Sequence, residues 1–379
     1  MKIVYLDYAA ATPLDSKVLA AMRPYFTNKF FNPSAIYLPA KAVHQAVEAA
    51  RSKAAAMLGA RSAEIIFTAG GTEANNLAIH GVMRHYSDKK VLISSIEHES
   101  VLAPAHRYNC QELPVLADGL IDLSAFERLI DDDTVLVSIM LANNEIGTIQ
   151  PVRRIADTIR QVLVQRRKSG NLLPLYLHSD ATQAANYLDL HLSRLGVDLM
   201  TLNGGKIYGP KQSGLLWIRS GLTLEPLLDG GGQEFNLRSG TENVPGVIGF
   251  SLALEMAQTM RSVEAERLKK LQQLFYDRLA KKVPSCITNG SLTRRLPNNV
   301  HITVPGQDNE RLLISLDEAG ILAAAGSACS ASDQKPSHVL RALGLSDNDA
   351  RSSLRFTMGR ATTERDIQYT VDTLARLIA

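Results

Sequence analysis

LYLHSD (175–180) and DLMTLNG (198–204) are two short, mostly apolar runs that each end in polar residues. Similar runs lie on either side: EIIFTA (64–69), VLISS (91–95), TVLVSIM (134–140) and SGLLWIR (213–219). Their Val, Ile and Leu alternate little with polar residues, which is typical of strands buried on both faces. Helices are expected between the runs, at 72–86 behind Thr72, at 124–131 behind Ser124 and at 151–167 opened by Pro151. This alternation indicates an α/β fold with a mostly parallel sheet covered on both faces.

The pattern changes after about residue 244. Residues 247–283 are expected to form one long helix, because Leu252, Met256 and Leu268 recur at helical spacing. Two strands and three helices are expected beyond it: NNVHITV (298–304), SSLRFTM (352–358), 309–319, 337–343 and 363–378. We therefore expect a large domain over 15–245 and a smaller α+β domain formed by 1–14 and 246–379.

Composition narrows the choice of partners. The chain has 379 residues, of which 45% are hydrophobic and 21% charged, and its formal net charge is +3. A balance so close to neutral argues against nucleic acid or a membrane as the main partner. Its three cysteines, Cys110, Cys286 and Cys329, are too few for a disulfide framework and form no zinc motif. We expect a cytoplasmic protein whose thiols stay reduced.

GGTEANN (70–76) follows an expected strand and opens an expected helix. Gly70 and Gly71 let a ligand approach the backbone closely, and the free N–H groups and dipole of a helix start favour an anion such as phosphate. The same pattern also suits a plain turn capped by Thr72.

HSDATQ (178–183) places Asp180 at the end of an apolar strand, on the side of the sheet where α/β proteins bind ligands. Asp180 could cap a helix. It could equally pair with the ring nitrogen of pyridoxal phosphate (PLP), which needs an acidic partner to act as an electron sink.

LNGGKIYGPK (202–211) sets Lys206 between glycines, just past an expected strand. This setting suits a Schiff-base lysine, whose amine must reach a carbonyl and lose its proton. Lys211 is the competing candidate, although its place after Gly-Pro favours a solvated turn. One strand–helix–strand step separates Asp180 from Lys206, so both can face the same crevice.

GSACSAS (326–332) surrounds Cys329 with small residues. Most cysteines behave as small buried hydrophobes, and that reading suits Cys110 and Cys286 better. A loop of Gly, Ser and Ala can be exposed, as a nucleophile that must travel requires.

Together these motifs resemble the cysteine desulfurases, fold-type I PLP enzymes of the class-V aminotransferase superfamily, and specifically their iron–sulfur-cluster and nitrogen-fixation group. The implied fold is aspartate-aminotransferase-like, with a seven-stranded sheet in the large domain. The motifs follow the family's order nearly end to end: YLDYAAATP (5–13), FFNPSA (30–35), FTAGGTEANN (67–76), EHES (97–100), LANNEIGTIQP (141–151), HSDATQ (178–183), KIYGPK (206–211), RSGTEN (238–243), GSACSA (326–331) and SLRFTMGR (353–360).

The resemblance implies a role for individual residues. Lys206 would be the Schiff-base lysine, Asp180 the partner of the pyridine nitrogen, and Cys329 the persulfide-forming cysteine. Asn32 and Arg355 would take the substrate carboxylate, for which a guanidinium is suited because it binds in two-point fashion. The other residues would contact the cofactor directly. His98 would lie on the ring, where it can also shuttle protons, and Asn144 and Gln183 would hydrogen-bond the phenolic oxygen. Gly71 and Thr72 would bind the phosphate, and Thr241 would bind the phosphate in the other subunit of a homodimer.

The chain departs from the family pattern just before Lys206. The family usually has Ser-x-His there, whereas this chain has Asn203, Gly204 and Gly205. Loss of one hydrogen bond to the cofactor phosphate weakens binding by about tenfold to a hundredfold. Asn203 can still donate through its amide and Gly205 through its backbone N–H, so we expect PLP to bind.

The activity that the resemblance implies is that of a sulfurtransferase. L-cysteine would become L-alanine, and its sulfur would pass through a Cys329 persulfide to an acceptor protein for iron–sulfur cluster assembly or tRNA thiolation. Two alternatives remain open: another fold-type I PLP enzyme, such as an aminotransferase or a selenocysteine lyase, and a weakly active sulfur-relay protein. Asn203 and Gly205 are the support for the second alternative.

Overall fold

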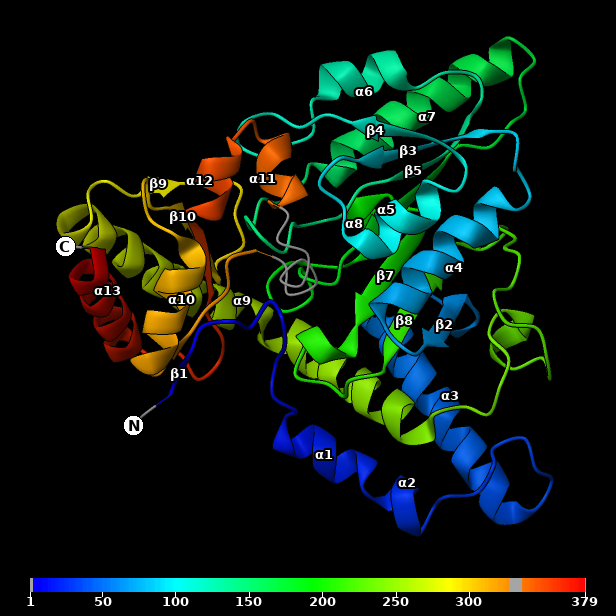
Figure 1. The fold of residues 1–379 in the computed structure, drawn as a ribbon. Coiled ribbons are helices and arrows are strands. Elements are labelled where there is room, and N and C mark those ends of the chain that lie inside the picture. The colour runs from blue at the N-terminus through cyan, green and yellow to red at the C-terminus, as the bar shows by residue number, and fades with distance from the viewer. Residues whose placement is uncertain (1–2, 327–335, 379) are drawn as a thin grey trace.

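A seven-stranded sheet forms the centre of the larger part of the molecule (Figure 1). The computed structural model describes residues 3–326 and 336–378. The strands of this sheet are β2 (Ile65–Thr68), β3 (Lys90–Ser94), β4 (Asn109–Leu113), β5 (Thr134–Ser138), β6 (Tyr176–Asp180), β7 (Leu199–Asn203) and β8 (Gly214–Ile218). Their order is β2-β8-β7-β6-β5-β3-β4, and β8 alone runs antiparallel to its two neighbours. The expected mostly parallel α/β sheet is therefore confirmed.

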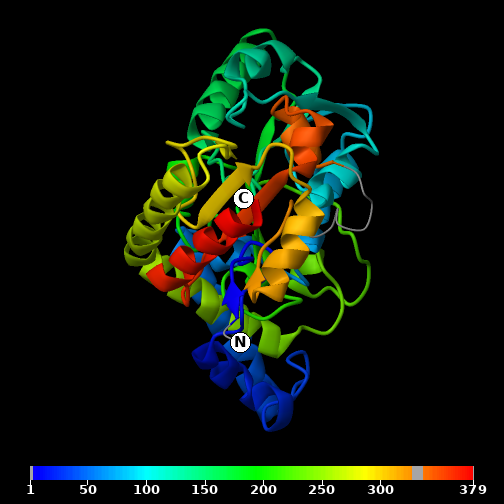
Figure 2. The ribbon, with the colours of Figure 1, turned by 60° about the vertical axis from the view of Figure 1, so that its left-hand side comes forward.

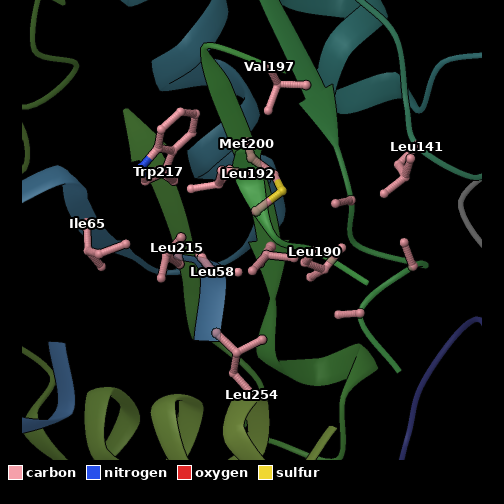
Figure 3. Close-up of a cluster of buried hydrophobic side chains, with 14 of the residues drawn as sticks. Leu58, Ile65, Leu141, Leu190, Leu192, Val197, Met200, Leu215, Trp217 and Leu254 are labelled. Carbon is pink, nitrogen blue, oxygen red and sulfur yellow. The ribbon is translucent and has the colours of Figure 1, made fainter. Parts of the chain in front are cut away.

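Helices cover both faces of this sheet, because its inner strands are apolar on both sides. They are α3 (Leu38–Leu58), α4 (Gly71–Met83), α5 (Glu99–Ala105), α6 (Leu123–Leu129), α7 (Val152–Lys168), α8 (Leu192–Leu195) and the first half of α9 (Val244–Lys282). On β2, Ile65 and Phe67 pack into one core with α3 and α9, whereas Ile66 packs into the opposite core with α4 and α5. Figure 3 shows part of the first core, where Leu58 of α3 lies close to Leu215 of β8.

The smaller part of the molecule holds a three-stranded antiparallel sheet in the order β12-β10-β9. Its elements are β9 (Ile287–Thr288), β10 (Asn299–Thr303), β11 (Ile321–Leu322), β12 (Ser353–Thr357), α10 (Asn309–Glu318), α11 (His338–Ala342), α12 (Asp347–Arg351) and α13 (Glu364–Ile378). Helices α9, α10 and α13 pack around this sheet (Figures 1 and 2). Strand β1 (Val4–Tyr5) pairs with β11, so β1 packs in the smaller part of the molecule.

Helix α9 connects the two parts. It has 39 residues, which at 1.5 Å per residue makes it about 58 Å long. Phe250 and Leu254 pack in the core of the large sheet, whereas Leu271 and Phe275 pack in the core of the small one. The change of core therefore falls inside α9, after Ala257, and not at residue 245. Two short helices, α1 (Ser16–Met22) and α2 (Pro24–Thr27), also lie against α9.

The elements expected from the apolar runs are present with shifts of a few residues at their ends. The expected long helix 247–283, for example, is α9, and the strand at 298–304 is β10. Strand β4 and helix α3 were not expected. In the described part of the chain, no helix has both the length and the apolar character that crossing a membrane requires.

Candidate active site

A cavity of about 300 Å³ opens where β6 and β7 end, at the edge of the large sheet that faces the small part. Ligand sites in open α/β sheets lie beyond the carboxyl ends of the strands, and the volume is at the low end of small-molecule pockets. The cavity brings together nine residues that the sequence singled out: Gly71, Thr72, His98, Asn144, Asp180, Gln183, Asn203, Lys206 and Arg355.

Asp180 is the last residue of β6 and only 8% exposed. Its Oδ2 accepts a hydrogen bond from Nδ2 of Asn75 at 2.7 Å, and its Oδ1 accepts one from the backbone N–H of Thr182 at 2.9 Å. These two bonds fix the orientation of the carboxylate, which can accept further hydrogen bonds. Asp180 is therefore held ready for a donor in the cavity.

Two buried titratable groups lie near Asp180. Burial lowers the pKa of His178 to about 4, although the charge of Asp180 acts in the opposite direction. Its ring bonds to Ser138 Oγ at 2.8 Å and Thr201 Oγ1 at 3.0 Å, which ties β5, β6 and β7 together. Burial, assisted by the charge of Asp180, raises the pKa of Glu97 well above its ordinary value. His178 is therefore neutral near pH 7, and burial favours the uncharged form of both groups beside Asp180.

Lys206 follows β7 in a single 3-10 turn (Gly204–Lys206). A Cβ on Gly204 would lie 2.1 Å from Ser213 Oγ and 2.8 Å from the carbonyl oxygen of Pro210, so this sharp turn requires glycine. Asn186 holds the carbonyl oxygen of Lys206 at 2.7 Å. The Nζ of Lys206 donates to the carbonyl oxygen of Ala10 in the N-terminal segment. The turn thus directs the lysine amine to the wall of the cavity.

Helix α4 begins at Gly71 beside this amine. Its N-cap residue, Gly70, has a φ of 146°, a conformation that L side chains rarely adopt. A Cβ on Gly71 would come within 3.3 Å of Thr182 Oγ1, so Gly71 allows α4 to start close to the residues that follow β6, whereas a Cβ on Gly70 would meet nothing within 4 Å. No side chain caps α4, which excludes the reading of GGTEANN as a turn capped by Thr72. The first N–H groups of α4 can therefore bind an anion.

His98 occupies the N-cap position of α5. Its Nδ1 accepts a hydrogen bond from the backbone N–H of Ser100 at 3.1 Å, so in the neutral ring the proton lies on Nε2. The ring lines the cavity together with Met140 and Ser100. In this tautomer His98 presents the Nε2–H donor to a ligand in the cavity.

Arg355 reaches the cavity from β12 of the small part. It is 2% exposed, and its Nη2 lies 2.7 Å from Oδ1 of Asp7 while its Nη1 donates to the carbonyl oxygen of Asn144 at 3.1 Å. Its Nε is buried without a partner among the described residues. This guanidinium is rigidly held and still has N–H groups for an anionic ligand.

Four of the singled-out residues do not line this cavity. Thr241 lines a separate cavity of about 200 Å³, so its contact with the other subunit's cofactor stays a prediction. Cys329 lies outside the described residues. Asn32 is exposed, and its Oδ1 accepts from the N–H of Ser34 in a local turn, so its expected contact with the substrate carboxylate stays a prediction. Gly205 lines the adjoining cavity described below.

The backbone N–H of Gly205 donates to Oδ1 of Asn203 at 2.9 Å. In this conformation Asn203 takes this N–H, so the expected contact of Gly205 with the cofactor stays a prediction. Lys211 is exposed in a bend, as expected, and its Nζ donates to the carbonyl oxygen of Thr12 at 2.8 Å.

Two site residues, Asn75 and Thr182, were not assigned from the sequence although both stand in motifs that were singled out. Asn75 Oδ1 and Thr182 Oγ1 are buried and have no partner in the part of the chain that the structure describes, and both residues line the cavity. Unpaired buried polar atoms indicate a polar ligand. An amine, a fixed carboxylate and a helix N-terminus match the aldehyde, ring nitrogen and phosphate of PLP, so the residues present fit this cofactor.

Comparison with known proteins agrees with this geometry. The family model for class-V aminotransferases matches residues 4–370. Cysteine desulfurase IscS of Dictyoglomus turgidum is 41% identical over 382 residues, covering 99% of this chain and 94% of that protein. Cysteine desulfurase IscS 1 of Archaeoglobus fulgidus is 40% identical over 381 residues, covering 99% of this chain and 96% of that protein.

Solved structures of similar proteins agree with this family assignment. A NifS-like protein superimposes with a TM-score of 0.90 at 31% identity, covering 99% of both chains. A structure described as SspA in complex with cysteine superimposes with a TM-score of 0.80 at 33% identity, covering 94% of this chain and 98% of the other.

Proposed function

The chain belongs to the cysteine desulfurase family of class-V aminotransferases, and we propose that it uses PLP to convert L-cysteine into L-alanine while Cys329 takes up the sulfur as a persulfide. The observation that carries the proposal is that Lys206, Asp180, His98 and Arg355 line one cavity beside the N-terminus of α4.

Different residues of the cavity would bind different parts of the cofactor. Lys206 would bind it covalently, Asp180 would pair with its ring nitrogen, and the N–H groups at Gly71 and Thr72 would take its phosphate. His98 would lie on the ring, and Asn144 and Gln183 at its phenolic oxygen. When bound, PLP supplies the electron sink that makes the α-hydrogen of an attached amino acid acidic.

The chain's own groups orient the substrate and move its protons. Arg355 would hold the carboxylate of L-cysteine at two points. Lys206 would take the α-proton with its Nζ, and His98 would serve as a second proton carrier. Asp180, held by Asn75 and Thr182, would keep a proton on the ring nitrogen.

The sulfur step needs no outside oxidant or reductant. The Cys329 thiolate forms an S–S bond with the substrate sulfur as the C–S bond breaks, and the electron pair stays with the carbon fragment, which is protonated to L-alanine. L-cysteine and one thiol thus become L-alanine and one persulfide. Gly326 and Ser337, the described residues near Cys329, support this role, because both lie beside Glu145, next to Asn144 of the cavity.

The test compares the three cysteines. We expect Cys329→Ala to keep the visible absorbance of the bound cofactor and to lose alanine and sulfide formation from L-cysteine. Cys110→Ala and Cys286→Ala are matched controls, because burial raises the pKa of these thiols to about 12 and about 11 and keeps them protonated. Full turnover by Cys329→Ala would overturn the nucleophile, and turnover that requires a keto-acid acceptor would indicate an aminotransferase.

We also propose that the enzyme works as a homodimer. Phe26, Phe30, Ile36, Tyr37 and Leu38 form an apolar segment (residues 26–38), in which Ile36 is 87% and Leu38 80% exposed. An exposed apolar cluster of this kind is typical of a protein interface. In the proposed dimer, a second copy of the chain would bring its Thr241 to the cavity that contains Lys206. In ultracentrifugation, Ile36→Lys/Leu38→Lys should sediment as a monomer, while Leu172→Lys, which changes another exposed apolar residue, should not. A dimer formed by the double variant would contradict this surface.

The destination of the sulfur is part of the proposal. We propose an acceptor protein of cytoplasmic iron–sulfur cluster assembly or tRNA thiolation. Support for the compartment comes from Cys110 and Cys286, which are unpaired, and from the chemistry of Cys329, which requires a reduced thiol. Mass spectrometry of the persulfidated enzyme mixed with candidate acceptors tests the transfer. Cell fractionation tests the compartment.

A further inference from the structure

A second cavity, of about 570 Å³, adjoins the first at the start of α4. The two share Ala10, Gly71, Thr72, Asn203 and Lys206. The second cavity is also lined by Gly205 and Lys211, which do not line the first. It therefore lies at the end of the site where the N–H groups of α4 would hold a phosphate.

Gly205 and Lys211 occupy neighbouring space in this second cavity. A Cβ on Gly205 would lie 3.4 Å from Oδ1 of Asn203 and 3.8 Å from Cγ of Lys211, which are ordinary contact distances. The φ of Gly205 is not in the left-handed region, so neither sterics nor backbone conformation requires glycine there. Gly204, whose Cβ would collide with Ser213, shows the contrast. The stem of Lys211 thus runs beside the position that a side chain at 205 would take.

The ammonium group of Lys211 is tethered but not neutralised. Its Nζ donates to the carbonyl oxygen of Thr12 at 2.8 Å, and within residues 3–326 and 336–378 it has no acidic partner. Glu73, which also lines this cavity, is engaged by Arg238 at 2.9 Å and by the N–H of Ala69 at 3.1 Å. An ammonium group has three N–H donors, so two remain for an anion.

We propose that Lys211 supplies the cationic contact to the cofactor phosphate, and that it does so in the place left open by the missing side chain at Gly205. The inference rests on the proposed function, because it requires the phosphate to lie at α4. The proposal gives a role to Lys211, which the sequence analysis left as the alternative candidate for the Schiff-base lysine. It also accounts for the Thr12 tether, which holds the ammonium group at the cavity wall.

The experiment compares two ligands that differ only in the phosphate. Protein stripped of cofactor with hydroxylamine is titrated by equilibrium dialysis with PLP and, separately, with pyridoxal. Lys211→Met should raise the Kd for PLP by about tenfold to a hundredfold, the effect of one lost hydrogen bond to a charged group, and leave the Kd for pyridoxal unchanged. Lys281→Met, an exposed lysine of α9, is the matched control and should change neither value.

Two rescue variants sharpen the test. Lys211→Arg, which keeps the charge, should bind PLP nearly as well as the wild type. Gly205→His in the Lys211→Met background should recover PLP affinity, because the new ring enters space that the shortened cationic stem has left.

An unchanged Kd for PLP in Lys211→Met, or an equal loss for PLP and pyridoxal, would overturn the role of Lys211. A wild-type protein that binds neither ligand would overturn the proposed function instead.

Discussion

Replacement of Arg355 by Gln separates recognition of the substrate carboxylate from every other part of the site. A hydrogen bond to a charged group contributes about 1.5–3 kcal/mol. Two such bonds from one guanidinium therefore contribute at least about 3 kcal/mol, or roughly 150-fold in affinity. The guanidinium is 2% exposed and fixed by Asp7 and Asn144, so its N–H groups are already oriented before the substrate binds.

The assay uses cysteamine, which is L-cysteine without its carboxylate. The concentration of each ligand that gives half of the change in the cofactor's visible absorbance is measured for wild type and Arg355→Gln. We expect the wild type to prefer L-cysteine by about 150-fold or more, and Arg355→Gln to show a preference below about tenfold. Affinity for cysteamine should be equal in the two proteins.

The control addresses the ion pair that the substitution breaks. Arg355→Gln leaves Asp7 unpaired, although Asp7 is 20% exposed and can be hydrated. Asp7→Asn/Arg355→Gln removes both charges and should show the same loss of preference. If either variant kept the wild-type preference for L-cysteine while binding PLP normally, Arg355 would not be the carboxylate group.

Three further predictions concern stability. Glu234→Gln leaves the buried Arg51, now paired with Glu234 at 2.7 Å, with the more exposed Glu48 as its remaining charge partner. It should lower the free energy of unfolding in urea by about 3 kcal/mol, the lower end of the range for a broken buried pair. Asp157→Asn, from an exposed pair, should cost less than about 1 kcal/mol, and equal effects would contradict the argument. Burial lowers the pKa of His301 to about 3, so only the unfolded chain takes up this proton near pH 5. Stability should therefore fall by about 3 kcal/mol between pH 6.5 and 4, and His301→Gln should show a shallower fall. The raised pKa of Glu97 has the opposite effect on stability: the free energy of unfolding should fall as the pH rises above about 4.5, because this carboxyl ionises more readily in the unfolded chain than in the folded one. Glu97→Gln should therefore raise Tm at pH 8 more than at pH 4, and a shift that is equal at the two pH values would refute this.

The central strands could be predicted because burial on both faces leaves runs such as TVLVSIM with almost no polar residues. Strand β4 was missed because it is an edge strand: Asn109 is exposed and Cys110 and Gln111 are half-buried, so its residues match no buried pattern. Helix α3 was missed because much of its buried face is alanine, at Ala40, Ala50 and Ala54, which gives only a weak periodic signal.

The site was predictable where chemistry follows the end of a strand, as for Asp180 and Lys206. Its supporting contacts were not. Asp7 meets Arg355 across 348 positions of the chain, and Asn75 meets Asp180 across 105. The first pair depends on how the N-terminal segment packs on β12, and the second on how α4 packs beside β6. No local pattern specifies either arrangement. The Asn203–Gly205 contact is the converse case, in which a local turn uses the N–H that the sequence assigned to a ligand.

The most direct test of the account is to ask which amine holds the cofactor. Protein incubated with PLP is reduced with borohydride, digested and mapped by mass spectrometry. The account predicts a single pyridoxyl-phosphate group on the peptide that contains Lys206. Labelling of Lys211 instead, or no stable label, would contradict the assignment of this cavity as the catalytic site.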